Sequence, residues 1–392
     1  MLISARRLHW LGFDRPAGAL LGAVACVLVG ALTPAQALAA IDGSTLLLLF
    51  GVMGMGAFLA VDGVFTQLEQ RLLLLARGSP KRLLAWVVWT AGPASALITN
   101  DAVCLLGAPV LVGLLRREKL PPLPYLLALA TAANTGSVAT LVGNPQNMLC
   151  ASLCGLDYWS HLLKLAPVAV VGLLINHAIL LLSFRRQLAA ASLSSGEKAP
   201  ALSGRSRLSL LLIAATVPIY TLGADLAWTA TAGFVALMLL HRRDTRELWS
   251  RIDWSLLLFF AALFVVVEAF TRSGAPAAFF HRVPLQGSAS ALQESVRSAG
   301  LFLLGSNVVS NVPFILVIRP QMATLAEPTL GWELLAMAST FAGNLTLLGS
   351  VANIIVAEAG RDLGGIGFLQ HLRVGLPLAI ITTLLGTLWL AL

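Results

Sequence analysis

Apolar residues along the chain gather in long runs that are separated by short polar stretches. The runs that we predict to be helices are 17–33, 43–61, 83–116, 123–155, 163–184, 208–224, 226–240, 254–270, 294–320, 333–358 and 374–392. They lack the alternating apolar and polar pattern of an outer-membrane barrel, so the expected spans are helices, which satisfy their own backbone groups in lipid. The pattern predicts an all-α polytopic membrane protein.

Two of these runs are too long and too polar in the middle to be single helices. Run 83–116 would be about 50 Å long as one helix, against a hydrocarbon core of about 30 Å, and Thr99-Asn100-Asp101 interrupts it. Run 294–320 breaks in the same way at Ser310-Asn311, followed by Pro313. We therefore predict two re-entrant hairpins, which leaves about nine crossing segments.

The positions of the basic residues predict the orientation of the chain. With the N-terminus inside, 21 of the 26 Lys and Arg residues fall on the inner side. The five on the outer side are Lys164, Arg272, Arg282, Arg297 and Arg319. This split agrees with the positive-inside rule, so we expect the N-terminus inside and the C-terminus outside.

The order of spans and hairpins repeats in the two halves with opposite orientation, which predicts two inverted repeats. The first repeat is 1–184, with hairpin 83–116 and broken helix 123–155; the second is 208–392, with an extra leading helix, hairpin 294–320 and broken helix 333–358. Segment 185–207 is basic and rich in Ser, Gly and Ala, and is predicted to be a cytoplasmic linker. The first apolar run is expected to stay as a helix rather than to be cleaved as a signal peptide.

The composition agrees with a membrane protein and excludes an ordinary soluble enzyme. Hydrophobic residues make up 58% of the chain and charged residues 11%, whereas soluble domains carry about 25% charge. The net charge of +8 lies at the ends of the apolar runs, as topology signals do, so no nucleic-acid partner is expected. The partners expected are the lipid bilayer and a small-molecule substrate.

Polar motifs interrupt the apolar runs at matching places in the two halves. The strings TLVGNPQNML (140–149) and TLLGSVANII (346–355) align without gaps. Such matched interruptions indicate a transporter binding site near the middle of the membrane. The candidate binding residues are Thr99, Asn100, Asp101, Asn134, Gly143, Asn144, Pro145, Asn147, Ser310, Asn311, Asn344, Thr346, Gly349, Ser350 and Asn353.

The chemistry of these positions suits small ions. A broken helix frees carbonyl groups, which together with amide and hydroxyl oxygens are ligands for Na⁺, while helix N-termini attract anionic groups. Asp101 is a candidate proton carrier or cation ligand, because acids at membrane depth are usually functional; its alternative role is to cap a helix. For the asparagines, the alternative role is to satisfy the broken backbone.

The motifs resemble those of the citrate-transporter-like membrane family of the ion transporter superfamily. The strings that carry the resemblance are LITNDAVCLLGAPVLVGLLRR, ANTGSVATLVGNPQN, SNVVSNVP and AGNLTLLGSVAN, from about residue 43 to the end. Relatives in this superfamily include arsenite permeases, sodium:dicarboxylate or sulfate symporters and NhaD-type sodium/proton antiporters. The resemblance implies an elevator-type transporter, often a homodimer, in a plasma membrane of the bacterial inner-membrane type.

The resemblance also implies two ion sites with the substrate between them. One would be formed by Thr99, Asn100, Asp101, Gly143, Asn144 and Asn147, and the other by Ser310, Asn311, Gly349, Ser350 and Asn353. If the coupling ion is Na⁺, its ligands would be Thr99, Asn100 and Asn147 in one site and Ser310, Asn311 and Asn353 in the other. No other cofactor is expected.

The chain departs from the dicarboxylate symporters at the hairpin tips. Their tips read Ser-Asn-Thr, whereas Asp101 and Val312 hold the third positions here. An acid beside the site would repel a dianion unless a cation or proton neutralised it, which makes the tips more similar to those of arsenite permeases, whose substrate can be neutral.

The function expected from the sequence is secondary active transport of a small anion or oxyanion, of the dicarboxylate, inorganic-anion or arsenite type, coupled to Na⁺ or H⁺. The alternative is a Na⁺/H⁺ antiporter that uses Asp101. The chain has no Walker A, G-x-S-x-G or H-E-x-x-H motif, so neither ATP-driven transport by this chain nor an enzymatic activity is expected.

Overall fold

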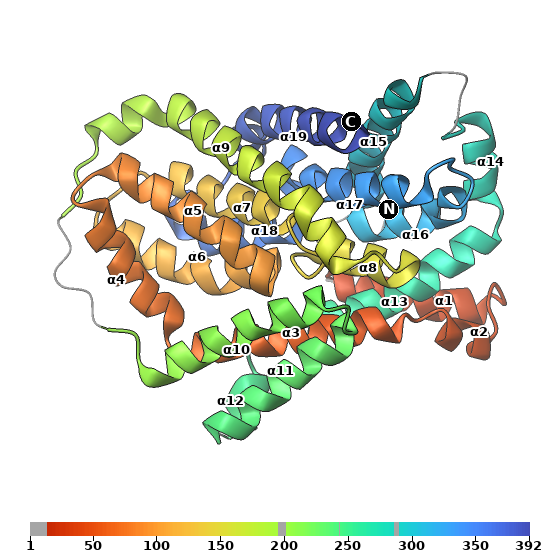
Figure 1. Cartoon of the computed structure of the whole chain (residues 1–392), viewed down its shortest axis with the longest axis horizontal. Helices are drawn as coiled ribbons and strands as arrows, with labels where there is room; N and C mark the ends of the chain where they lie inside the picture. The colour runs from red at the N-terminus through yellow and green to blue at the C-terminus, as the bar shows by residue number, and fades with distance from the viewer. Residues whose placement is uncertain (1–13, 195–200, 243, 286–289) are drawn as a thin grey trace.

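The computed structural model describes residues 14–194, 201–242, 244–285 and 290–392, and all of the elements in these ranges are helices (Figure 1). Helix α3 (Gly43–Val61) has the bounds of the predicted run, and α13 (Trp254–Arg272) begins at the predicted residue. Four described helices are long and apolar enough to cross a membrane: α3, α13, α9 (Tyr158–Ala190) and α19 (Phe368–Ala391). The prediction of an all-α membrane protein is confirmed at this level.

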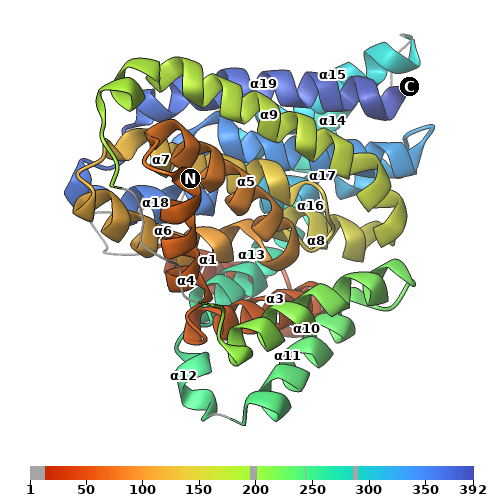
Figure 2. The same ribbon diagram turned by 60° about the vertical axis from the view of Figure 1, so that its left-hand side comes forward.

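The helices pack into two bodies. The first, which we call the scaffold body, contains α1 (Arg15–Leu28), α2 (Pro34–Ala39), α3, α10 (Gly204–Thr221), α11 (Leu226–His241), α12 (Thr245–Trp249) and α13. Figure 2 shows α3, α10, α11 and α12 together in the lower part of the molecule. Its main contacts join α3 to α11 and α1 to α13.

The second body, which we call the tip body, contains the interrupted helices of both halves of the chain. From the first half it takes α5 (Pro80–Ile98), α6 (Asn100–Arg117), α7 (Pro122–Ser137), α8 (Pro145–Cys154) and α9; from the second, α15 (Ala291–Val309), α16 (Asn311–Met322), α17 (Pro328–Leu345), α18 (Val351–Ala359) and α19, with the short 3-10 turns Leu347–Gly349 and Arg361–Leu363. Helices α7 and α17 are almost wholly buried and form its centre.

Two short amphipathic helices connect the bodies, and neither was predicted. Helix α4 (Val64–Ala76) contacts α3, α5 and α6, and α14 (Ala275–Arg282) contacts α13 and α16. Both lie in stretches whose polar residues interrupt the apolar pattern, so a search for long apolar runs passes over them. The ion pair between Arg117 Nη2 and Glu69 Oε1, at 2.9 Å, joins α4 to the end of α6.

Small residues allow the helices of each body to approach closely. A Cβ added at Gly136 of α7 would lie 2.3 Å from the carbonyl oxygen of Gly92 in α5. One added at Gly51 of α3 would lie 2.6 Å from the backbone nitrogen of Thr231 in α11. Small residues serve this purpose in membrane helix packing, because lipid provides no hydrophobic force between helices.

Helix ends differ from the sequence prediction around the linker. Helix α9 continues to Ala190 and α10 begins at Gly204, so both ends of the predicted linker 185–207 are helical. A helix can extend past the apolar run that defines it, since its polar residues then lie in water. Part of the linker lies outside the described residues, as do four of the basic residues predicted for the inner side: Arg6, Arg7, Lys198 and Arg243.

Candidate functional site

Each half of the chain contains a sharp turn between two helices, at the positions where the sequence predicted hairpin tips. Thr99 joins α5 to α6 with φ 84° and ψ 145°, and Ser310 joins α15 to α16 with φ 85° and ψ 151°. A positive φ is costly for a residue other than glycine and persists only where the surrounding structure holds it. The two turns, which we call the tips, therefore share one strained backbone conformation.

Glycine carbonyls support both tips. The backbone N–H of Asn100 donates to the carbonyl of Gly143 at 2.9 Å, and the Asn311 side-chain amide donates to the carbonyl of Gly349 at 3.1 Å. A Cβ at Gly143 would lie 2.1 Å from the Ser137 carbonyl oxygen. The glycine is thus needed for the close approach that holds the first tip in place.

Replacing Gly143 by Ala is expected to lower stability by about 1–3 kcal/mol, the usual cost of forcing extra volume into a packed site. The added methyl would have to move the backbone of 137–143, and with it the carbonyl that binds Asn100. Thermal unfolding of the purified variant in detergent measures the change. Gly113→Ala in α6 is the matched control, because nothing lies within 4 Å of its added Cβ; an equal loss in both variants would contradict the role given to Gly143.

The asparagines of the two broken helices fold back onto the carbonyls that the breaks expose. Asn147 Nδ2 donates to the Thr140 carbonyl at 2.9 Å. Asn353 Nδ2 donates to the carbonyls of Gly343 and Thr346 at 2.7 and 3.1 Å. These two side chains therefore satisfy backbone carbonyls at the breaks, which is the alternative role predicted for the asparagines from the sequence.

A buried network of amides and hydroxyls joins the two halves. Asn134 of α7 donates to the side-chain oxygens of Asn344 and Asn353, at 3.1 and 2.9 Å. It accepts hydrogen bonds from the Asn100 amide at 2.9 Å and the Ser350 hydroxyl at 3.1 Å. Buried polar groups of this kind are costly to leave unpaired, so Asn134 fixes the position of the first tip against the second half.

A smaller group of side chains links α8 to α17. The Asn144 amide donates to the Thr340 hydroxyl at 3.0 Å, and that hydroxyl donates to Asn147 Oδ1 at 3.0 Å. Two further hydrogen bonds join α17 and the residue after it to other helices. Asn344 donates to the Thr135 hydroxyl of α7 at 2.9 Å, and the Thr346 hydroxyl donates to the Asn307 side-chain oxygen of α15 at 2.8 Å. Most predicted candidates thus lie together in one polar core.

A partly open cavity lies between the two tips, and it is lined by both halves and by the scaffold body. Predicted residues that line this cavity, which we call the tip cavity, are Asn100, Asp101, Pro145, Ser310, Asn311, Gly349 and Ser350. Phe259 and Phe260 of α13 provide an apolar wall. Seven other predicted residues do not line the tip cavity and lie behind the residues that do: Asn134, Gly143, Asn144, Asn147, Asn344, Thr346 and Asn353.

Four helices of the described chain begin at the tip cavity: α6, α8, α16 and α18. The first turn of each helix provides the positive end of a helix dipole. Pro145 and Pro313 have no N–H group, and the N–H groups of Asn100, Ala102, Asn147 and Ala352 already have acceptors within the protein. Such ends bind anions and carboxylate or oxyanion groups. The backbone around the cavity is therefore suited to an anionic or oxygen-rich ligand.

The cavity also contains acceptors that could hold a cation. The side-chain oxygens of Asn100 and Asn311 are buried and lack a hydrogen-bond partner among the described residues. Each belongs to a side chain whose amide nitrogen is already bound, so the oxygen orientation is fixed. The two tips thus offer equivalent oxygens that a Na⁺ ion or a donor group would satisfy.

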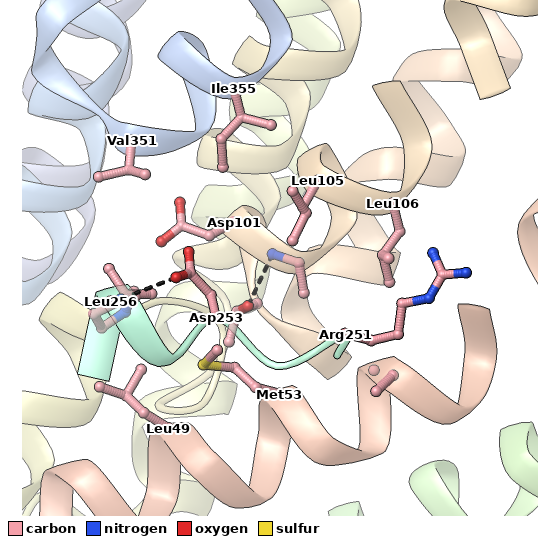
Figure 3. A pocket seen from close by; sticks show the side chains of 15 residues that line it. Leu49, Met53, Asp101, Leu105, Leu106, Arg251, Asp253, Leu256, Val351 and Ile355 are labelled. Atoms are coloured by element: carbon pink, nitrogen blue, oxygen red, sulfur yellow. Dashed lines mark hydrogen bonds between the residues drawn. The ribbon is translucent and has the colours of Figure 1, made fainter. Parts of the chain in front are cut away.

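Sequence reasoning missed two residues of this region. Gln146 lines the tip cavity, but its equivalent in the second half is Ala352, so comparing the repeats did not reveal it. Asp253 lines a neighbouring cavity together with Thr99 and Asp101 (Figure 3). It stands directly before an apolar run, where it reads as a helix cap; the structure shows that it does cap α13, accepting from Leu256 N–H at 3.0 Å.

Broken helices that surround a cavity between two packed bodies are the architecture of a membrane transporter, and comparison with known proteins agrees. The family model described as citrate transporter matches residues 1–342. A silicon efflux transporter, LSI3, of Oryza sativa subsp. japonica is 31% identical, over 96% of this chain and 92% of that protein. A putative transporter, arsB, of Dictyostelium discoideum is 25% identical, over 96% of this chain and 87% of that protein.

A solved structure has a similar fold. The YdaH transporter of Alcanivorax borkumensis matches with a TM-score of 0.56 at 17% identity, over 95% of this chain and 88% of that one. The chain belongs to the citrate transporter family. It is a multi-pass membrane transporter and not an enzyme, which confirms the resemblance of its motifs.

Proposed function

We propose that the protein is a secondary active transporter that moves a small anion or oxyanion, coupled to Na⁺ or H⁺, across a plasma membrane of the bacterial inner-membrane type. The observation that carries this proposal is the tip cavity, where four helix N-termini and two unpartnered amide oxygens meet. The helix ends would hold the oxygens of the substrate, and the amide oxygens would hold the coupling ion.

The movement that we propose is an elevator movement of the tip body along the scaffold body. The tip cavity lies on the boundary between them, because α13 forms one wall while the tips form the others. Helices α4 and α14 connect the bodies in both halves. The matching conformations of Thr99 and Ser310 support two inverted repeats with re-entrant hairpins, in a chain with its N-terminus inside that functions as a homodimer.

For the coupling ion, the structure favours oxygens at the tips over those at the breaks. Asn100 and Asn311 each have a free side-chain oxygen, whereas Asn147 and Asn353 use theirs within the network. We therefore propose that Asn100 and Asn311 contact the ion directly and that Asn147 and Asn353 position the breaks. Asp101 lines the same cavity and would supply the negative charge that balances a cation.

The test is solute uptake into proteoliposomes that contain a pH-sensitive dye. Na⁺ and pH gradients are imposed separately, and succinate, citrate, sulfate, phosphate, arsenite and silicic acid are added in turn. We expect flux of Na⁺ or protons that appears with one solute and stops without it. Solute movement that depends on neither gradient and never exceeds equilibrium would contradict secondary active transport.

A Na⁺/H⁺ antiporter is the second candidate, and one observation favours it. Asp101 lines two cavities and forms no ion pair within the described part of the chain, as expected of an acid that exchanges Na⁺ for H⁺. Proton movement driven by Na⁺ in the absence of any solute would establish this function instead.

A further inference from the structure

A second cavity lies beside the tip cavity, at the boundary between the two bodies. Thr99, Asp101 and Leu105 line it from the tip body, and Met53 and Asp253 line it from the scaffold body. Asp101, Pro145, Leu256 and Val351 line both cavities. We call this space the interbody cavity; it is the place where α6 and the start of α18 face α3 and the start of α13.

Two carboxyl groups face each other across the interbody cavity. Figure 3 shows the Asp101 side chain, from α6, pointing toward that of Asp253, at the start of α13. Both side chains line the same cavity. The two residues come from different bodies, so their proximity depends on how the bodies are docked.

Both carboxyl groups belong to helix starts. Asp253 Oδ1 accepts from Leu256 N–H at 3.0 Å. Asp101 lies in the first turn of α6, and its Oδ1 is buried without a hydrogen-bond partner among the described residues. A buried carboxylate oxygen with no partner is costly, and the facing charge of Asp253 adds to that cost.

Among the described residues, no basic side chain forms an ion pair with either carboxyl group. Arg251 lies at the edge of the cavity, but it is exposed and its guanidinium extends away from the carboxyl groups in Figure 3. The remaining lining side chains are neutral and mostly apolar.

We propose that Asp101 and Asp253 bind one Na⁺ ion between the tip body and the scaffold body. A hard monovalent cation suits carboxylate oxygens, with the nearby Thr99 hydroxyl and water as further ligands. The ion would replace repulsion between the two carboxylates by attraction to a shared charge. Because Asp253 belongs to the scaffold body, the complete site exists only while the bodies are docked as they are here.

This proposal deepens the proposed function, on which it rests, by adding a Na⁺ site beside the one at the tips. The Na⁺ ion in the interbody cavity would hold the tip body against the scaffold body until it leaves. The docking of the two bodies seen here would then depend on Na⁺ bound by the aspartate pair. A Na⁺ site formed by the tips alone would not make the docking depend on Na⁺.

The test compares thermal unfolding of purified wild-type protein, Asp253→Asn and Asp42→Asn at one fixed pH, in NaCl and in choline chloride of equal ionic strength. Asp42 is the control, because it caps α3 as Asp253 caps α13, and it lines neither cavity. Its other contact is with the Ser152 hydroxyl, which donates to Asp42 Oδ2 at 2.8 Å and can accept from an asparagine amide instead. Asparagine is as good a cap as aspartate, so both variants keep their helix start.

We expect Na⁺ to stabilise the wild type and Asp42→Asn with the same half-saturating concentration. In Asp253→Asn, that concentration should rise about tenfold or more, since one of two charged ligands is lost. Without Na⁺, Asp253→Asn should unfold at a higher temperature than the wild type, because the repulsion with Asp101 is gone. If Asp253 only capped α13, its replacement by Asn would not raise the unfolding temperature in the absence of Na⁺.

Two results would overturn the proposal. One is an unchanged half-saturating Na⁺ concentration in Asp253→Asn, which would assign all Na⁺ binding to the tips or elsewhere. The other is wild-type protein whose stability does not respond to Na⁺, as expected if a proton neutralises the pair. The uptake assay judges the proposed function separately: solute flux that is normal in a protein without Na⁺ stabilisation would remove the interbody site and leave the transporter intact.

Discussion

Asp101→Asn is expected to abolish coupled transport while leaving expression and folding intact. The substitution keeps the shape of the side chain and removes the charge that lies in both cavities. The cost to α6 is small, because an acid in the first turn of a helix contributes about 0.3–1 kcal/mol. Uptake in proteoliposomes measures the transport, and thermal unfolding of the same preparation confirms that the variant is folded.

Asp42→Asn is again the comparison, since it removes an acidic cap from α3 outside both cavities. Its uptake should match that of the wild type. Coupled transport at the wild-type level by Asp101→Asn would remove Asp101 from the mechanism, and with it the ion-balancing role that both proposals assign to this residue.

The second large effect is expected from the variants Asn311→Ala and Asn353→Ala. The first should lose affinity for ion or substrate, and the second should lose stability. Asn311 faces the tip cavity with an unpartnered oxygen, so its loss should raise the half-saturating concentration of ion or substrate about tenfold, as expected for the loss of one good contact. Flux as a function of Na⁺ and of solute concentration measures this change.

Asn353 should instead affect stability. Its amide satisfies the carbonyls of Gly343 and Thr346, and its oxygen accepts from Asn134. Alanine would remove these hydrogen bonds and leave the Gly343 carbonyl without its side-chain donor, at a cost of about 1–3 kcal/mol, which thermal unfolding detects. The Thr346 carbonyl would keep its hydrogen bond from Gly349 N–H. Apparent affinities that stay unchanged in both variants would show that the tips and breaks do not form ion or substrate sites.

Much of the helix pattern could be predicted from the sequence because lipid imposes a simple rule on it. Helix α3 has the predicted bounds, and the helix interruptions at Thr99 and Ser310 fall where polar residues break an apolar run. A polar break in such a run must be satisfied somewhere inside the protein, so its position predicts a bend. The amphipathic helices α4 and α14 follow no such rule and were missed.

The sequence predicted which residues form the candidate site, but not the different role of each residue. Aligning 140–149 with 346–355 selected residues that the structure gathers into one polar core. It could not show that the Asn311 oxygen is free while the Asn147 oxygen is bound by Thr340. That difference depends on α17 packing against α8, a contact between segments far apart in the chain.

Asp253 shows a further limit. An acidic residue directly before an apolar run is explained well enough as a helix cap, and the structure shows that Asp253 does cap α13. Its second environment, beside Asp101, arises only when one body docks on the other. Local sequence patterns contain no information on such docking.

The tips are alike in backbone and unlike in charge. Thr99 and Ser310 have the same conformation, yet the residues two positions on are Asp101 and Val312. The electric field in the tip cavity is therefore lopsided, and a cation in it would lie off the midline, nearer α6. Two tips that are equal in backbone conformation therefore present unequal charge to a bound ion, so the site has a polarity that its backbone does not reveal.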